Sequence, residues 1–240
     1  MIKLGGAKEK PVGDRTLKQN PSQTTVKSES KQELQSESKK AKEEQKKRAE
    51  DKVVLDNLLK VLKKAIEKNA SLKKFKEQLF LYITPDGLRI QIFDKKNRPM
   101  FDLGSAIVKP YTTKILNEIG KVIRTVPNQI SISGHTDATL FHKGFVLYEN
   151  DYGEEIKLPY TNWELSADRA NAARRTLLTS GLKTNQIGRV VGFSDSVLHN
   201  KKNKTDPSNL RISIIVMNRK SEFDMKHTEG ADTVKQNILH

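Results

Sequence analysis

The chain has 240 residues, enough for one domain with long tails, and carries a formal net charge of +15. Only 35% of its residues are hydrophobic, which predicts that part of the chain does not join a packed core. It has no cysteine, and this excludes disulfides, thiol nucleophiles and cysteine metal sites. The basic charge fits nucleic acid, anionic lipid or an anionic cell-wall polymer, but the few aromatic residues are not interleaved with basic ones as in proteins that stack on bases.

Composition divides the chain into four parts. We expect a flexible polar linker over residues 1–45, an amphipathic helical segment over 46–79, a folded domain over 80–218 and a polar tail over 219–240. No apolar run approaches the ~20 residues that span a membrane, and the first residues do not resemble a signal peptide. We therefore expect the transmembrane segment and export signal of an exported protein to lie outside this chain.

The helical segment carries one apolar stripe. Its members recur at helical spacing between lysines and glutamates: Leu55, Leu58, Leu59, Leu62 and Ile66. The stripe predicts a helix from Asp51 to Lys68 that packs either on the domain or on a second copy of the chain.

The domain begins with two predicted strands around a Pro85-Asp86-Gly87 turn, one over 79–83 and one over 88–93. A helix follows from Pro110 to about Thr125, because proline is favoured at the first helical position. Alternation at Ile130 and Ile132 then predicts a strand.

Residues 138–160 have no clean period, and we interpret them as a long loop. A capping box at Thr161 and Glu164 starts the next helix, which Gly181 ends. Short strands at 190–191 and 212–216 complete the domain. The order predicts an α/β (α+β) two-layer sandwich, a β-α-β-α-β core with an extra N-terminal helix and strand.

The most informative motif combines two segments: Gly134-His135-Thr136-Asp137 at a strand end, and Asn162 to Arg174 at the start of a helix. If strand and helix pack together, Asp137 and Arg169 flank one pocket. Such a pair can hold a ligand that carries an ammonium and a carboxylate, because the aspartate binds the first and the guanidinium fork the second.

With an arginine before the last strand, these motifs resemble the OmpA-like peptidoglycan-binding family over about residues 80–218. The resemblance implies that Asp137 and Arg169 bind the zwitterionic end of diaminopimelate in the wall peptide, and that the matching Asn162 and Leu165 shape the pocket. It also makes Thr136 and Arg211 candidate peptidoglycan-binding residues. Leu210 stands where the family usually has another arginine.

Within that family, four segments resemble the stator B subunits of flagellar motors (MotB): 87–92, 97–101, 162–171 and 189–192. The resemblance implies a non-enzymatic wall anchor without cofactor or metal, in the periplasm and tied to the inner membrane. It implies a MotA-type partner, reached through a membrane segment absent here, and a homodimer. We expect no nucleic-acid partner.

Other interpretations stay open at this point. The chain could be a Pal- or OmpA-type envelope tether, or a basic nucleic-acid-binding protein. Asp137 could cap its own loop, and Arg169 could pair with Glu164, with Asp168 or with Asp137 itself. A zinc site at His135, Asp137 and His142 lacks a third spaced histidine or cysteine, and alternating strand residues do not give Ser133, His135 and Asp137 the geometry of a catalytic triad.

Overall fold

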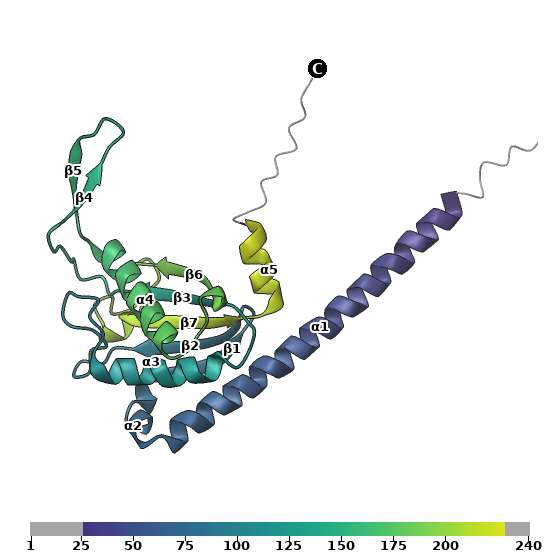
Figure 1. The fold of residues 1–240 in the computed structure, drawn as a ribbon, viewed down its shortest axis with the longest axis horizontal. Helices are drawn as coiled ribbons and strands as arrows, with labels where there is room; N and C mark the ends of the chain where they lie inside the picture. The colour runs from purple at the N-terminus through teal and green to yellow at the C-terminus, as the bar shows by residue number, and fades with distance from the viewer. Residues whose placement is uncertain (1–25, 229–240) are drawn as a thin grey trace, which may run out of the picture. The chain divides into compact units, whose positions relative to one another are not determined.

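The computed structural model describes residues 26–228 (Figure 1). Contacts divide the chain into two units, Met1–Lys47 and Arg48–His240, and the boundary falls inside the first helix. The elements are α1 (Val26–Lys68), α2 (Ala70–Lys73), β1 (Leu79–Thr84), β2 (Gly87–Phe93), α3 (Pro110–Ile123), β3 (Ile130–His135), β4 (Phe145–Glu149), β5 (Glu155–Pro159), α4 (Asn162–Thr179), β6 (Ile187–Gly192), β7 (Arg211–Met217) and α5 (Arg219–Thr228). Short 3-10 turns occupy Lys76–Gln78, Thr184–Gln186 and Pro207–Asn209.

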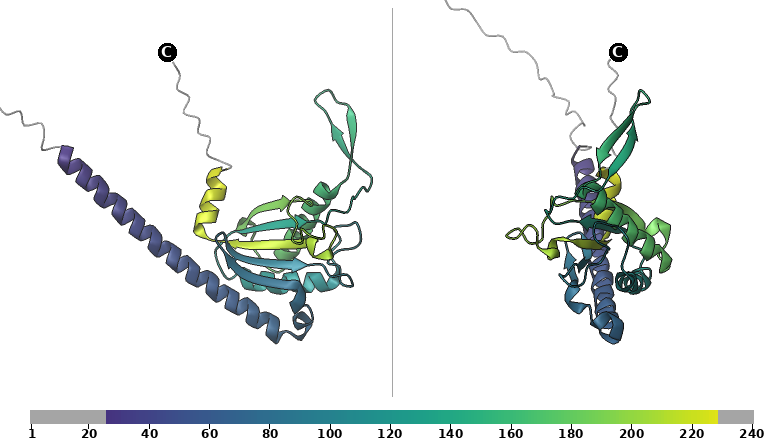
Figure 2. Two further views of the ribbon diagram at one scale, coloured as in Figure 1. Left: turned by 180° about the vertical axis from the view of Figure 1, so that it is seen from behind. Right: turned by 90° about the vertical axis from the view of Figure 1, so that its left-hand side faces the viewer.

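The main sheet of the second unit has five strands in the order β1-β2-β7-β3-β6. Only β3 and β6 pair in parallel, because α4 connects them as a crossover, while the other neighbours are antiparallel. Strands β4 and β5 form a separate hairpin, which projects from the body of the domain in both views (Figure 2). The two-layer α/β sandwich predicted from the sequence is confirmed.

One hydrophobic core joins the sheet to its helices. Alternate residues of β2 and β7 and the inner faces of α3 and α4 are buried in it, together with Leu55, Leu58, Leu62 and Ile66 of α1. The apolar stripe of α1 therefore packs on its own domain, which decides between the two interpretations of that stripe.

Several boundaries lie where local chemistry predicted them. Helix α3 begins at Pro110, and α4 begins after Thr161, whose side chain and backbone form a capping box with Glu164. The N–H of Thr161 donates to Glu164 Oε2 at 2.7 Å. Gly181, with φ of +94°, follows the end of α4, since a left-handed residue suits glycine best.

Three segments differ from the expected pattern. The predicted loop over 138–160 contains the β4–β5 hairpin, helix α1 begins at Val26 within the predicted linker, and α5 occupies the start of the predicted polar tail. The rest of that linker and tail, 1–25 and 229–240, lies outside the described residues. Among the helices of the described part, none is both long and apolar enough to cross a membrane.

Candidate functional site

The site lies where β3 ends and α4 begins. A methyl group at Gly134 would lie 2.1 Å from the carbonyl oxygen of Ser166, so only glycine lets strand and helix approach this closely. Gly192 on β6 makes a similar approach, since a Cβ there would lie 2.7 Å from Ser166 Oγ. This packing brings the residues after β3 next to the first turns of α4.

Asn162 links the two segments directly. Its Nδ2 donates to the carbonyl oxygens of Thr139, at 2.8 Å, and of Asp137, at 3.4 Å. Asp137 Oδ1 in turn accepts from the N–H of Thr139 at 3.2 Å, a turn of the kind that aspartate often makes with its own loop. The carboxylate of Asp137 is partly exposed and its second oxygen has no hydrogen-bond partner in the described part of the chain.

Arg169 is held by its stem. The residue is only 7% exposed, its Nε donates to the carbonyl oxygen of Ser105 at 3.0 Å, and its Cζ lies 5.0 Å from the centre of the Phe101 ring. Its two terminal nitrogens have no hydrogen-bond partner among the residues that the structure describes. The bidentate end of the guanidinium is therefore available to a ligand.

The charges around Arg169 are close but not paired. Burial lowers the pKa of the guanidinium, while the charges of Asp94, Tyr160 and Asp137 act in the opposite direction. Within residues 26–228 no ion pair joins Arg169 to Asp137, to Glu164 or to Asp168. Asp168 instead accepts from the Tyr160 hydroxyl at 2.6 Å. The pairings that would have given Arg169 a purely structural role are thus missing from this arrangement.

Sequence reasoning missed Asp94, which the fold places near Arg169. Its Oδ1 accepts from the N–H of Met100 at 2.7 Å, and the residue is 6% exposed. Burial, with a smaller effect from Asp137, raises its pKa to about 6, although the Met100 N–H and Arg169 oppose the shift. An acidic residue directly after the apolar strand 88–93 was the available signal.

Thr136 and Leu165 are buried beside the site. The N–H of Thr136 donates to the carbonyl oxygen of Ser194 at 2.9 Å, and its Oγ1 has no hydrogen-bond partner in the described structure. Leu165 is 4% exposed on the first turn of α4. Both side chains are therefore buried beneath the surface of the site and do not lie at its exposed rim.

Arg211 lies elsewhere. Because Ile212 faces the helices, Arg211 projects from the opposite face of the sheet, beside its strand partner His135. Its terminal nitrogens donate to the carbonyl oxygens of Asn209, at 3.1 Å, and Val197, at 2.8 Å. Burial lowers its pKa to about 10. The structure does not bring Arg211 together with Arg169 and Asp137.

His135 shares that opposite face. Its Nε2 lies 3.3 Å from Ser133 Oγ, but its Nδ1 has no hydrogen-bond partner in the described part, so no carboxylate orients the ring. Burial and the charges of Arg211 and Arg89 lower its pKa to about 3. No group of three or more metal-ligating side chains occurs among the described residues.

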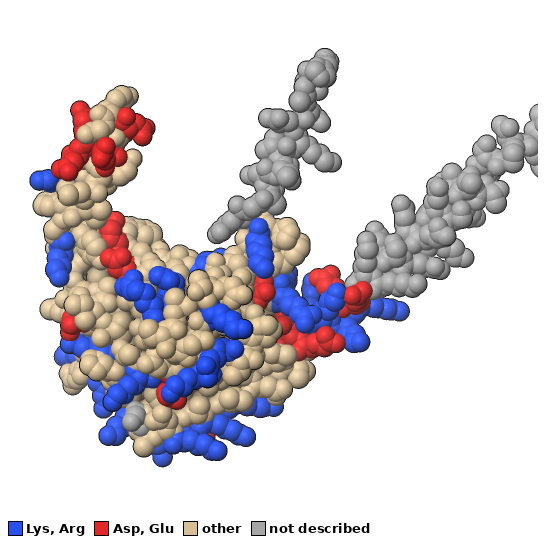
Figure 3. All heavy atoms as spheres, in the orientation of Figure 1, with Lys and Arg blue, Asp and Glu red and all other residues tan. Residues whose placement is uncertain are grey.

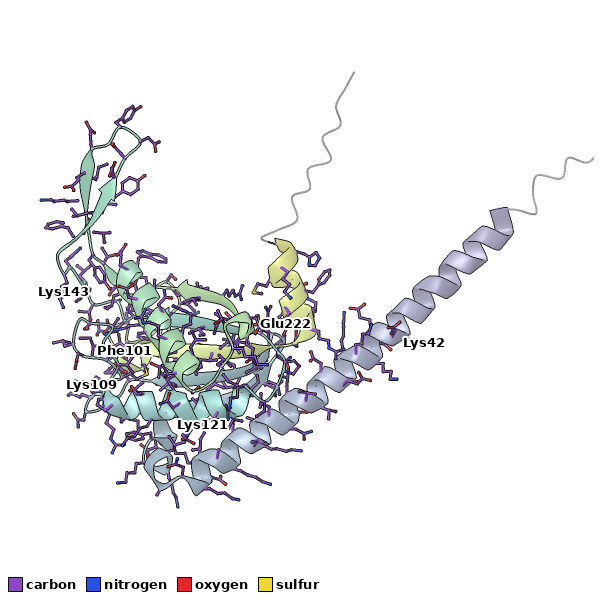
Figure 4. All side chains as sticks on the ribbon, viewed as in Figure 1. Lys42, Phe101, Lys109, Lys121, Lys143 and Glu222 are labelled. Atoms are coloured by element: carbon purple, nitrogen blue, oxygen red, sulfur yellow. The ribbon has the colours of Figure 1, made fainter. Side chains whose placement is uncertain are left out.

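The base of the hairpin borders the site. Lys143 Nζ donates to the carbonyl oxygen of Gly104 at 3.4 Å, and Phe141 lies against Gly104, next to the Ser105 carbonyl that holds Arg169. Figure 4 labels Phe101 and Lys143 at this end of the domain, where the hairpin leaves it. Neither Ser105 nor Phe101 was singled out from the sequence, because residues 101–108 show no helical or strand periodicity from which their positions could be predicted.

Comparison with known proteins identifies the region that carries this site. Residues 100–211 match the OmpA family. Motility protein B of Escherichia coli K12 is 39% identical over 177 residues, which are 74% of this chain and 53% of that protein, so the chain spans about half the length of this relative.

Two solved structures are also similar. The periplasmic domain of Helicobacter pylori MotB (residues 97–256) is 18% identical with a TM-score of 0.43, covering 62% of this chain and 95% of that one. The cell wall anchor of the T6SS from Pseudomonas aeruginosa is 23% identical with a TM-score of 0.45, covering 59% and 89%.

Proposed function

Since residues 100–211 match the OmpA family and the chain is a homologue of Motility protein B, we propose that it anchors a flagellar stator to the cell wall by binding peptidoglycan non-covalently. The anchor performs no chemical reaction. It works in the periplasm beside the inner membrane, with a MotA-type subunit as its stator partner and as a homodimer.

The observation that carries this proposal is the unpaired fork of Arg169 near Asp137. A buried guanidinium usually has its donors satisfied by the protein, because an unmet donor loses its hydration without compensation. Here only Nε is used, by the Ser105 carbonyl, and Asp137 lies within electrostatic reach without forming an ion pair. A ligand with a carboxylate and an ammonium would pair with both side chains, its carboxylate with Arg169 and its ammonium with Asp137.

Diaminopimelate supplies that combination in the stem peptide of the wall. Its carboxylate would take the two terminal nitrogens of Arg169, and its ammonium would take Asp137. Asn162 holds the Asp137 loop in place, and Thr136 and Leu165 are buried at the adjoining ends of β3 and α4. Lysine at the same position of the peptide has the ammonium without the second carboxylate, so the pocket would distinguish the two wall types.

Pull-down on purified sacculi tests the site. We expect Asp137→Asn and Arg169→Ala each to weaken binding to diaminopimelate-type sacculi by roughly thirtyfold or more, because truncating one member of a desolvated charge pair costs ~2–5 kcal/mol. Thermal melts of the Asp137→Asn protein should change little, and those of Arg169→Ala should show only the loss of its contacts with Ser105 and Phe101. Arg175→Ala is the matched control, since Arg175 is an exposed arginine on the same helix.

Binding to lysine-type and to diaminopimelate-type sacculi tests the ligand specificity of the site. Wild type should bind lysine-type sacculi about as weakly as Arg169→Ala binds the diaminopimelate type. Normal sacculus binding by both site variants would refute the site, and loss of thermal stability without loss of binding would give the two residues a structural role instead.

A further inference from the structure

The β4–β5 hairpin is an arm without a partner in its own domain. All ten of its strand residues are exposed, and its strands pair only with each other. A two-stranded hairpin by itself is marginally stable in water, because it buries little apolar surface. Something outside this domain would therefore stabilise it.

One face of the hairpin is apolar. The pairs Val146 with Leu158 and Tyr148 with Ile156 place four large side chains on the same side, each between 38% and 53% exposed. Surface side chains of this kind are ordinary when scattered, but a contiguous apolar face on a projecting arm is typical of a protein-binding surface.

The tip of the hairpin is acidic. Glu149 lies directly opposite Glu155, and Asp151 and Glu154 stand in the turn between them. Like charges opposite each other destabilise a strand pair, so a cationic group placed beside them would stabilise the arm. In Figure 3 the acidic side chains gather at this tip, while lysines and arginines are spread over the body of the domain. The charges favour a basic protein surface and oppose an anionic polymer.

A surface with the matching features lies at the other edge of the sheet. A groove of about 380 Å³ runs between α1 and β1, with Lys63 and Lys76 among its lining residues. The rest of its lining is mostly apolar: Ile66, Leu79, Phe80 and Leu81, with Glu67. Strand β1 is also the edge of the sheet, so its outer backbone groups have no strand partner within the described sheet.

We propose that the β4–β5 hairpin of one chain docks in the α1–β1 groove of a second copy of the same chain. The apolar face covers the groove, and Asp151 and Glu154 at the turn meet Lys63 and Lys76. Glu149 and Glu155 project from the opposite face of the hairpin, because side chains alternate along each strand. The two surfaces do not meet within one domain, because the hairpin leaves the sheet after β3, three strands away from β1, and points away from the body (Figures 1 and 2). Reciprocal docking by two chains closes the assembly as a symmetric dimer.

Most of the α1 stripe does not provide this contact, since Leu55, Leu58 and Leu62 are already buried in their own domain and only Ile66 borders the groove. The hairpin contact therefore assigns the homodimer a surface that the chain does expose. It is independent of the wall-binding site, because it uses neither Asp137 nor Arg169.

Sedimentation of the full chain over a concentration series tests the contact by charge exchange. Asp151→Lys with Glu154→Lys, and separately Lys63→Glu with Lys76→Glu, should each weaken self-association by about tenfold or more, because like charges then face each other. An equimolar mixture of the two variants should associate again, since each hairpin then meets a groove of opposite charge. Lys201→Glu with Lys202→Glu is the control for a change of net charge and should have little effect.

A second pair of variants tests the apolar face. Tyr148→Ser with Ile156→Ser should abolish association at concentrations where wild type is dimeric, while Phe223→Ser, an exposed aromatic on α5, should not. A wild-type chain that stays monomeric, or a mixture of the charge variants that fails to associate, would overturn the proposal. So would hairpin variants that dimerise normally but lose sacculus binding, because the arm would then contact the wall.

Discussion

Two buried arginines on opposite faces of the same sheet use their nitrogens differently. Arg211 is 5% exposed, and both of its terminal nitrogens donate hydrogen bonds, to the carbonyl oxygens of Asn209 and Val197. Arg169 is 7% exposed, and among the described residues only its Nε donates a hydrogen bond, to the carbonyl oxygen of Ser105. Burial alone does not distinguish these two arginines, whereas the donors that they use do, and this difference is the reason for proposing Arg169 as the ligand-binding one.

The difference follows from what each side chain holds. Arg211 connects its strand to the segment over 194–209, which covers that face of the sheet. Arg169 is fixed through its stem, by the Ser105 carbonyl and the Phe101 ring, so the planar end of the group stays free. The hydrogen bonds of Arg211 stabilise the fold, whereas Arg169 leaves its two terminal nitrogens without a hydrogen-bond partner in the described residues.

The largest effect should come from Arg211→Ala, which we expect to lower the free energy of unfolding by about 3 kcal/mol. The substitution removes two charged hydrogen bonds, each contributing ~1.5–3 kcal/mol, from the carbonyl oxygens of the buried Asn209 and the exposed Val197. Chemical denaturation measures the change, and sacculus binding of the folded protein should stay near wild type. Arg169→Ala is the reference, with a smaller loss of about 1–2 kcal/mol, because it removes one charged hydrogen bond, to the Ser105 carbonyl, and the contact with Phe101. The comparison fails if Arg211→Ala loses wall binding at full stability.

The next effect concerns Asp94, which lies on the Arg169 side only. Its pKa of about 6 exceeds its usual 3.8, so between these values the folded chain holds a proton that the unfolded chain has released. The stability contributed by neutral Asp94 is therefore present at low pH and lost as pH rises through 6, where the full cost of a buried charge appears.

Asp94→Asn removes that cost and keeps an acceptor for the Met100 N–H. We expect the variant to be more stable than wild type by on the order of 2 kcal/mol at about pH 8, with the difference shrinking toward about pH 4. Denaturation curves at several pH values measure it. A pH-independent difference would mean that the carboxyl does not titrate in this range.

The smallest effect is that of Arg169→Lys. Lysine keeps the positive charge but loses the bidentate geometry and the planar contact with Phe101, so binding to diaminopimelate-type sacculi should weaken by about tenfold, less than for Arg169→Ala. Arg211→Lys is the matched control and should leave sacculus binding unchanged. Equal binding by wild type and Arg169→Lys would show that charge, not shape, selects the ligand.

The parts of the fold set by local chemistry could be predicted from the sequence. Pro110, the capping box at Thr161 and the left-handed Gly181 each place a helix end with little help from the rest of the chain. The hairpin could not be predicted in this way, because both of its faces are exposed and only β5, over four residues, alternates polar with apolar side chains, while β4 does not. Helix α5 was missed because its residues are mostly polar.

For the site, sequence motifs brought Asp137, Asn162 and Arg169 forward, and the fold places them together. The motif alone did not say which face Arg211 would take. The signal was present in the alternation of β7, since Ile212, Ile214 and Val216 point into the core and Arg211 has the opposite parity. Asp94 and Ser105 depend on contacts across more than sixty residues of chain, which no local pattern encodes.

The close approach at Gly134 also has a consequence for how fast the proposed anchor would bind and release its ligand. Because backbone contact between β3 and α4 sets the spacing of the two halves of the pocket, little of the site has to be ordered when a wall peptide arrives. Association should then proceed at the ordinary docking rate of ~10⁵–10⁷ M⁻¹s⁻¹, and differences between ligands should appear as differences in residence time. In the proposed dimer, which would carry two such sites, a peptide that leaves one site would be bound again before the other site releases its own, so attachment would outlast either contact alone.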